Sequence, residues 1–109
     1  MMKEIKAIIR PDRLTDVLQA LHQIPNLPGV TISSVRGFGK RYPDGGGESF
    51  DQVTMAKVEI VVPSAVLAEV LGAVERAAHT GNLGDGKIFV LPVEHAIRIR
   101  SGERDLRAI

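Results

Sequence analysis

The clearest chemical signal in the sequence is a glycine-rich stretch, TGNLGDGK, at residues 80–87. Closely spaced glycines let backbone amides turn into one concavity, and Lys87 adds a positive charge suited to phosphate. The stretch is not a Walker loop, which runs from a strand into a helix and has Ser or Thr after its lysine; here Ile88 follows. A helix end at Gly81 followed by an ordinary glycine turn is the alternative interpretation.

A second signal is a pair of arginines near the end of the chain. Arg98 and Arg100 alternate with Ile97 and Ile99, which predicts a short extended segment at 94–100 with both guanidinium groups on one face. Guanidinium forks match phosphate and carboxylate geometry. A solvated strand face would also explain the pattern, but the glycine-rich stretch makes a bound anion the preferred interpretation.

Residues 36–39, RGFG, match the start of the RNP1 consensus of RNA-recognition modules. The match then fails, because Lys40 and Arg41 stand where an aromatic residue and a valine belong. Only four aromatic residues exist in the chain, and the net charge is +1. An RNA-binding module therefore remains a disfavoured alternative.

Catalytic and metal-binding patterns are weak. His22, His79 and His95 form no i, i+4 pair, and with no cysteine in the chain we expect no metal site. Asp12 and Asp16 lie one helical turn apart, but no pairing of nucleophile and base emerges. We therefore do not expect an enzyme, and a slow nucleotide hydrolase is the alternative that a turnover assay would test.

The pattern of apolar residues gives the elements that must position these groups. Alternation predicts strands at 3–10, 30–38, 57–62 and 88–91, with a short fifth strand at 94–100. Helical spacing predicts helices at about 12–24 and 64–79, the second with Ser64 as its N-cap. A long loop at 39–54 and a loosely held tail at 101–109 complete the chain.

This order of elements is that of a ferredoxin-like βαββαβ sandwich, a single α+β domain over residues 1–109. Both helices would cover one sheet face and leave the other bare. Lys6 and Glu59 suit solvent there, whereas Ile8 and Val61 do not, so we expect a homo-oligomer.

Length and composition agree with one ordinary domain: 109 residues, 44% hydrophobic and 25% charged. No apolar run approaches the length of a membrane span, and the amino-terminal residues lack the pattern of a secretory signal. The lack of cysteine suits a reducing compartment. We expect a cytoplasmic location, no direct membrane insertion and no nucleic-acid partner.

Five segments together resemble the PII signal-transduction proteins over nearly the whole chain. They are IKAIIRPDRLTDVLQAL, VRGFG, VEIVVP, AAHTGNLGDGKIFVLPV and IRIRSGERDLRAI. The resemblance implies a trimer with adenine nucleotides, ATP or ADP, in the clefts between subunits, and Mg²⁺ accompanying ATP. It also implies a T-loop that docks on target proteins, at about 40–54 here, a B-loop at about 80–87 and a C-terminal segment at about 98–109.

The resemblance assigns the nucleotide site residue by residue. It places the phosphates beside Gly84, Asp85, Gly86 and Lys87, with Arg98 and Arg100 reaching them across the cleft. It places adenine and ribose among Ile8, Thr31, Gly37, Glu59 and Val61, next to Phe38 and Gly39. Lys40 stands where the family has an arginine near the phosphates.

The departures from the family pattern lie in and beside the T-loop, which is about five residues shorter than usual. Arg41 replaces the glutamine that holds 2-oxoglutarate with magnesium, and Met55 replaces a lysine of the same site. The uridylylated tyrosine has no counterpart; Tyr42 lies near the loop base, and Ser49 is a weak candidate for modification. These departures predict a nucleotide sensor without the 2-oxoglutarate and uridylylation inputs, which regulates a membrane transporter or an enzyme. A nitrogen-regulatory protein controlling ammonium transport is the alternative.

Overall fold

A computed structural model describes residues 1–41 and 49–109; for residues 40, 41 and 49–51 it describes the backbone alone. Its strands are β1 (Met2–Ile9), β2 (Thr31–Arg41), β3 (Ser49–Pro63) and β4 (Gly86–Val93), and its helices are α1 (Leu14–His22) and α2 (Leu67–Ala78). Single 3₁₀ turns at Pro11–Arg13 and Ser64–Val66 precede the helices, and a third lies at Asp105–Arg107.

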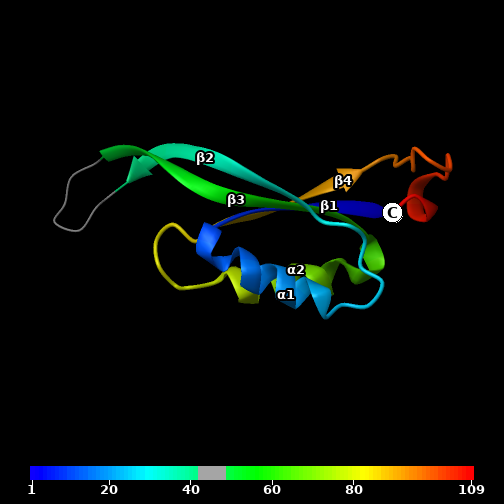
Figure 1. Ribbon diagram of the computed structural model, residues 1–109, viewed down its shortest axis with the longest axis horizontal. Helices are drawn as coiled ribbons and strands as arrows, with labels where there is room; N and C mark the ends of the chain where they lie inside the picture. The colour runs from blue at the N-terminus through cyan, green and yellow to red at the C-terminus, as the bar shows by residue number, and fades with distance from the viewer. Residues whose placement is uncertain (42–48) are drawn as a thin grey trace.

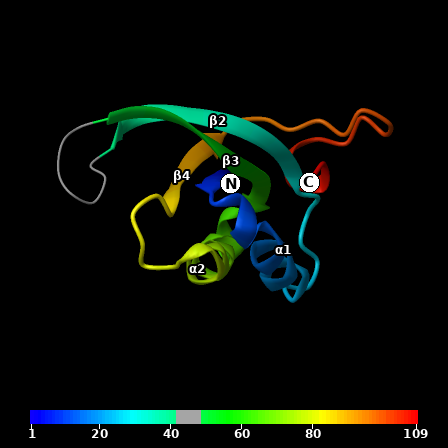
Figure 2. The same ribbon diagram turned by 60° about the vertical axis from the view of Figure 1, so that its left-hand side comes forward.

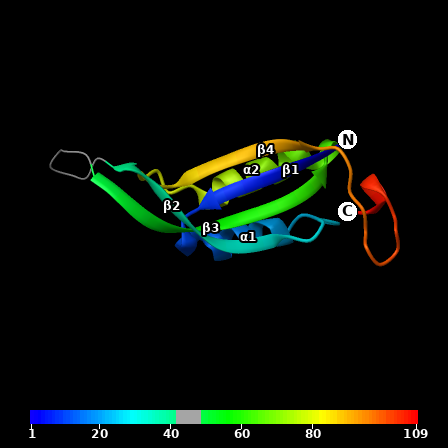
Figure 3. The ribbon, with the colours of Figure 1, turned by 90° about the horizontal axis from the view of Figure 1, so that it is seen from above.

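The four strands form one antiparallel sheet in the order β2-β3-β1-β4. Both helices pack on the same face of this sheet, and the other face is uncovered (Figures 1 and 2). This arrangement confirms the ferredoxin-like prediction. Figure 3 shows that the two ends of the chain lie at the same end of the sheet.

The core lies between the sheet and the helices. Alternate residues of β1 and β3 point toward the helices, as Ile5 and Ile60 do from directly paired positions. Val17 and Leu21 of α1 and Val70 and Val74 of α2 meet them, and all are almost fully buried. Burial of each such side chain stabilises the fold by about 1.5–3 kcal/mol. On the opposite face, Ile8 and Val61 are only half-buried, as predicted.

The predicted N-cap at Ser64 is wrong. The 3₁₀ turn before α2 begins at Ser64 with Pro63 in the cap position, and no side chain of the described ranges caps it. The Ser64 hydroxyl is buried without a hydrogen-bond partner in the described part of the chain, while its backbone N–H donates to the Met1 carbonyl at 2.9 Å. The fixed φ of Pro63 sets the entry into the helix instead.

The predicted loop at 39–54 is too long, because β2 continues to Arg41 and β3 begins at Ser49. β1 ends at Ile9, opposite Ala56, so the outer parts of β2 and β3 form a two-stranded ribbon that extends past the core. A ribbon away from the core needs no alternation of apolar residues, which is why the sequence pattern did not show it. Tyr42 lies outside the described residues.

The predicted strand at 88–91 is longer, from Gly86 to Val93, and includes Pro92 because β4 is an edge strand.

The predicted strand at 94–100 is wrong, and so is the loosely held tail. Residues 97–104 form a small hairpin in which the backbone N–H of Arg98 donates to the Glu103 carbonyl at 2.9 Å. The chain turns through Gly102, whose φ is 75°. The backbone N–H of Asp105 then donates to the Ala96 carbonyl at 2.8 Å, which fixes the final turn. No helix within the described ranges is long and apolar enough to cross a membrane.

Candidate functional site

The glycine-rich loop connects α2 to β4 and is organised around one carboxylate. Asp85 accepts hydrogen bonds from the backbone N–H groups of Thr80 (2.8 Å) and Gly81 (2.9 Å) and from the Thr80 hydroxyl. Arg10, which follows β1, donates from Nε to the same carboxylate at 2.9 Å. These contacts tie both ends of the loop and the end of β1 to a single group, so the loop is held in one shape.

The same contacts decide the charge of Asp85. Hydrogen bonds from the Thr80 hydroxyl and the Thr80 backbone N–H, with smaller contributions from Arg10 and the Gly81 N–H, hold the pKa of Asp85 well below its usual range; desolvation raises this pKa but is outweighed. Asp85 was predicted to stand beside phosphates. The structure directs its carboxylate into the loop, where Arg10 balances its charge.

The loop approaches β1 so closely that only glycine fits at one position. Gly86 has a φ of 95°, and a Cβ there would lie 1.8 Å from the Ile8 carbonyl oxygen. Lys87 follows, pairs in register with Ile8, and therefore lies on the uncovered sheet face. Lys87 is exposed and has no ion-pair partner in the part of the chain that the structure describes. The loop thus presents one unpaired cation beside its backbone.

Gly37, Phe38 and Gly39 lie at this same end of the sheet, on the ribbon formed by β2 and β3. Gly37 pairs with Val53, beyond the end of β1, and all three residues are exposed. The structure describes only the backbone of Lys40. The loop end of the sheet therefore gathers eight of the predicted site residues: Ile8, Gly37, Phe38, Gly39, Gly84, Asp85, Gly86 and Lys87.

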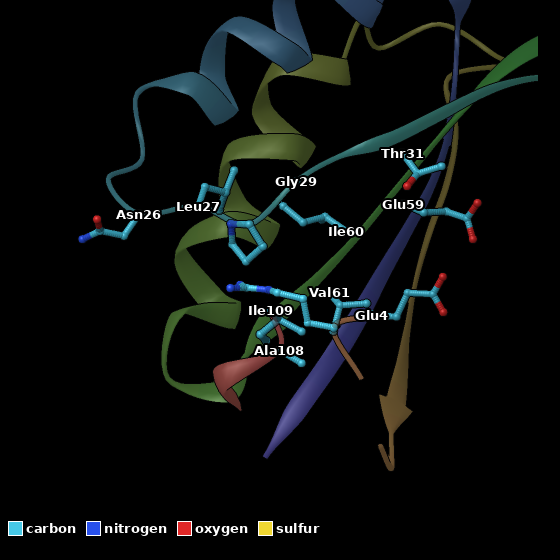
Figure 4. A pocket seen from close by; sticks show the side chains of 12 residues that line it. Glu4, Asn26, Leu27, Gly29, Thr31, Glu59, Ile60, Val61, Ala108 and Ile109 are labelled. Atoms are coloured by element: carbon cyan, nitrogen blue, oxygen red, sulfur yellow. The ribbon is translucent and has the colours of Figure 1, made fainter. Parts of the chain in front are cut away.

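A pocket of about 800 Å³ lies at the other end of the sheet, beside the connection from α1 to β2 (Figure 4). It is lined by four predicted site residues, Thr31, Glu59, Val61 and Arg98. Further lining comes from Glu4 on β1, from Asn26 and Leu27 after α1, and from the final residues Ala108 and Ile109. The pocket combines apolar walls with two carboxylates, a hydroxyl and a guanidinium group.

Arg98 and Arg100 do not share a strand face. Arg98 lies at the base of the hairpin, where its Nη1 contacts Glu103 Oε1 at 3.3 Å. Arg100 lies in the exposed turn and has no partner within the described ranges, and its neighbour Ile99 is 97% exposed. The prediction of a shared strand face is therefore wrong, because residues 99 and 100 lie in the hairpin turn and not in a strand.

The two groups of site residues do not meet within one chain. Lys87 lies at the start of β4 and Arg98 follows its far end, and the eight residues of this strand span about 23 Å. A ligand that contacts both cations needs a second copy of the chain.

Sequence reasoning missed several residues of both groups. Arg10 and Thr80 were not singled out, although a basic residue after a strand and a threonine before the glycines are ordinary partners for the loop carboxylate. The sequence pattern gives Glu4 no role beyond the predicted strand at 3–10, and Ile109 none beyond the predicted loose tail. No metal-binding cluster of three His, Cys, Asp or Glu side chains occurs among the residues with described positions.

The fold and these two groups define an α+β protein with a glycine-rich loop at one end of its sheet and a pocket at the other. The family model of the nitrogen regulatory protein P-II matches residues 2–103. The chain belongs to this P-II family.

Curated relatives match over the full length of the chain. A nitrogen regulatory protein P-II of Azospirillum brasilense is 40% identical over 99% of this chain and 100% of its own length. Nitrogen regulatory protein P-II 1 of Escherichia coli K12 is 42% identical with the same coverage. The crystal structure of Arabidopsis thaliana PII bound to citrate superposes with a TM-score of 0.83 at 42% identity, covering 99% of this chain and 92% of that one. The chain is therefore related to regulatory proteins along its whole length.

Proposed function

We propose that this P-II family chain is a homotrimeric, non-catalytic sensor that binds ATP or ADP between its subunits. The observation that carries the proposal is the separation of the two groups of site residues to opposite ends of the sheet. Lys87 and the glycine-rich loop supply one incomplete anion site, and Arg98 and Arg100 supply another. Packing of the uncovered faces, with Ile8 and Val61, would bring one group of each subunit to the other group of its neighbour.

The residues present fit a nucleotide. The loop offers backbone amides and a free ammonium group to phosphates. The pocket offers apolar walls at Leu27 and Val61 to a base, and Thr31 and Glu59 to a sugar. Mg²⁺ would accompany ATP as the counter-ion of its phosphates.

The output of the sensor is proposed to be the loop at about 40–54, which continues the β2–β3 ribbon. ATP and ADP can bias this loop only if they make different contacts at its base, where Gly37, Phe38 and Gly39 lie. We propose a membrane transporter or an enzyme as the target. Because Arg41 and Met55 replace the side chains of the family's 2-oxoglutarate site, nucleotide is proposed to be the remaining input.

Light scattering coupled to gel filtration tests the assembly, with an expected mass of about three times 11.8 kDa. Calorimetric titration of ATP and of ADP into the trimer then tests binding. A monomer at micromolar concentration would remove the site between subunits. A turnover assay with ATP tests the slow-hydrolase alternative, and we expect no product above that of the buffer.

Affinity capture from cell extract, with ATP, with ADP and without nucleotide, identifies the target. Capture that depends on which nucleotide is present supports a sensor. Specific capture of an ammonium transporter would favour the classical nitrogen-regulatory role over another transporter.

A further inference from the structure

Two glutamates lie side by side on the uncovered sheet face, and the assigned site uses only one of them. Glu4 on β1 pairs in register with Val61, and Glu59 on β3 pairs with Lys6, so the two glutamates are diagonal neighbours on adjacent strands. Both line the pocket, and Figure 4 shows their side chains extending on the same side of the sheet. Glu4 is therefore a second carboxyl group at the same wall.

The two carboxyl groups influence each other's protonation. Burial raises the pKa of Glu4, and a hydrogen bond between the two carboxyl groups raises it further; the same bond lowers the pKa of Glu59. Lys57 Nζ lies 3.5 Å from Glu59 Oε1, and Lys6 pairs in register with Glu59, two residues along β1 from Glu4. The positive charges of these lysines limit the increase in the pKa of Glu4 and further lower the pKa of Glu59.

The remaining neighbours carry little charge. β2 contributes Thr31, which pairs with Glu59, and β4 contributes Leu91, which pairs with Glu4. Arg98 is the only cation that the hairpin adds to the lining of this pocket, and its Nη1 contacts Glu103. The wall is thus an acceptor-rich surface that can hold one proton between its two members.

We propose that Glu4 acts with Glu59 as a specificity wall that binds the adjacent hydroxyls of a ribose and rejects a ribose phosphorylated at one of them. This inference rests on the proposed nucleotide function and names the part of the ligand that the pocket selects. Carboxylates accept hydrogen bonds from hydroxyl groups, and two adjacent carboxyl groups match two adjacent hydroxyls. A phosphate in the same place would face carboxyl oxygens, and because Lys57 already pairs with Glu59 at 3.5 Å, it would lose its hydration without a free cation to compensate.

A divalent cation is the rival occupant. Calcium takes six to eight oxygen ligands and magnesium six, whereas this wall supplies two carboxyl groups beside two lysines. The residues with described positions hold no third acidic or histidine side chain near them. The sugar is the better match.

The test uses the assembled, unmodified protein and calorimetric titration at pH 7 of four ligands: ADP, 2′-deoxy-ADP, 3′-deoxy-ADP and adenosine 3′-phosphate 5′-diphosphate. We expect at least one deoxy analogue to bind about tenfold to a hundredfold more weakly than ADP, because a hydrogen bond to a charged group is lost. We expect the phosphorylated analogue to bind at least about tenfold more weakly.

Variants then assign the effect to Glu4. E4Q is expected to weaken ADP binding and to reduce the difference in affinity between ADP and the phosphorylated analogue. E75Q, on the exposed face of α2, is expected to leave both affinities unchanged. Carbon-13 NMR of the glutamate carboxyls in the ligand-free protein gives an independent measure. There, E59Q should shift the titration of Glu4, and E75Q should not.

The outcomes separate the two proposals. If ADP does not bind to the unmodified trimer, the nucleotide function fails, and this inference fails with it. If ADP binds and all analogues bind equally well, only the specificity wall is overturned. Tight binding of Mg²⁺ or Ca²⁺ alone, lost in E4Q, would likewise overturn it in favour of a cation site. The analogue titrations use the unmodified protein, so they test the specificity wall even if E4Q does not fold.

Discussion

Arg10 and Asp85 are separated by 75 positions in the chain, yet the Nε of Arg10 lies 2.9 Å from Oδ1 of Asp85. The same guanidinium group donates from Nη2 to the Leu83 carbonyl at 2.5 Å. Arg10 therefore fixes the glycine-rich loop at two points from the neighbouring strand. The shape of the loop depends on a residue outside its own sequence.

We expect Arg10→Gln to weaken ATP binding by about tenfold, because the loop loses both charge-assisted contacts and must be ordered by the ligand. The free energy of unfolding should fall by only about 1 kcal/mol, since the Arg10 side chain is partly exposed. Calorimetry and chemical denaturation measure the two effects. Arg76→Gln, on the exposed face of α2, is the control. Equal ATP affinity in both variants would show that Arg10 does not shape the site.

The depressed pKa of Asp85 predicts how stability depends on pH. A carboxyl group whose pKa is lower in the folded than in the unfolded state stabilises the fold at any pH above its unfolded-state pKa. This stabilisation is lost as the pH falls from the unfolded-state pKa toward the folded-state pKa. The difference in the free energy of unfolding between the wild type and Asp85→Asn should therefore be at its maximum at pH 7. It should shrink once the pH drops below the ordinary value of 3.8. Urea denaturation at several pH values checks this, and a difference independent of pH would contradict it.

Gly86→Ala should be severely destabilising. A Cβ at this position would lie 1.8 Å from the Ile8 carbonyl oxygen, and the φ of 95° disfavours any side chain. We expect a loss of at least about 3 kcal/mol in the free energy of unfolding.

Gly72→Ala in α2 is the matched control. There the new Cβ meets only the end of the flexible Arg76 side chain, at 3.0 Å. We expect stabilisation of up to about 1 kcal/mol from the better helix propensity of alanine. Similar losses in both variants would contradict the steric argument.

Arg98→Ala and Arg100→Ala should each weaken ATP binding by about tenfold to a hundredfold, because each removes a charge-assisted contact to phosphate. The trimer should remain intact, since both side chains are exposed. Arg36→Ala, on an exposed part of β2, is a control that removes an equal charge. Unchanged calorimetric affinity in the Arg98 variant with an intact trimer would rule out its phosphate role.

2-Oxoglutarate should not bind tightly, even to the ATP-loaded trimer with magnesium. Arg41 offers no oxygen to the metal and repels it, and Met55 leaves the distal carboxylate without a partner. Calorimetric titration measures this, with ATP binding in the same sample as proof of competent protein. Micromolar binding would contradict the prediction and indicate that Arg41 clamps the dicarboxylate itself.

The sequence predicted the sheet and the helices because their residues alternate between a buried and an exposed environment. Ile5, Ala7 and Ile9 follow a period of two, and Val70 and Val74 follow a helical period. Where an element leaves the core, the signal disappears. The sequence pattern therefore predicts a loop over the β2–β3 ribbon, although its backbone ladder continues to Arg41.

The hairpin at the end of the chain shows the opposite error. Ile97, Arg98, Ile99 and Arg100 alternate as a strand would, but among the described residues no strand pairs with them beyond the single bridge from Ile97 to Arg104. Alternation of apolar and polar residues shows which side chains favour burial, but it does not show that a partner strand is present. Likewise, the glycines in the sequence predict the loop, whereas the hydrogen bond from Arg10 to Asp85 arises only from tertiary structure.

The separation of Lys87 from Arg98 by the length of β4 has a consequence for dilution. A single copy of the chain cannot present both cations to one phosphate group, so the complete set exists only where two copies meet. Any ligand that uses both cations adds its binding free energy to the association of the copies. Mass action then couples the two equilibria: dilute protein holds such a ligand less tightly, and an abundant ligand keeps dilute protein assembled.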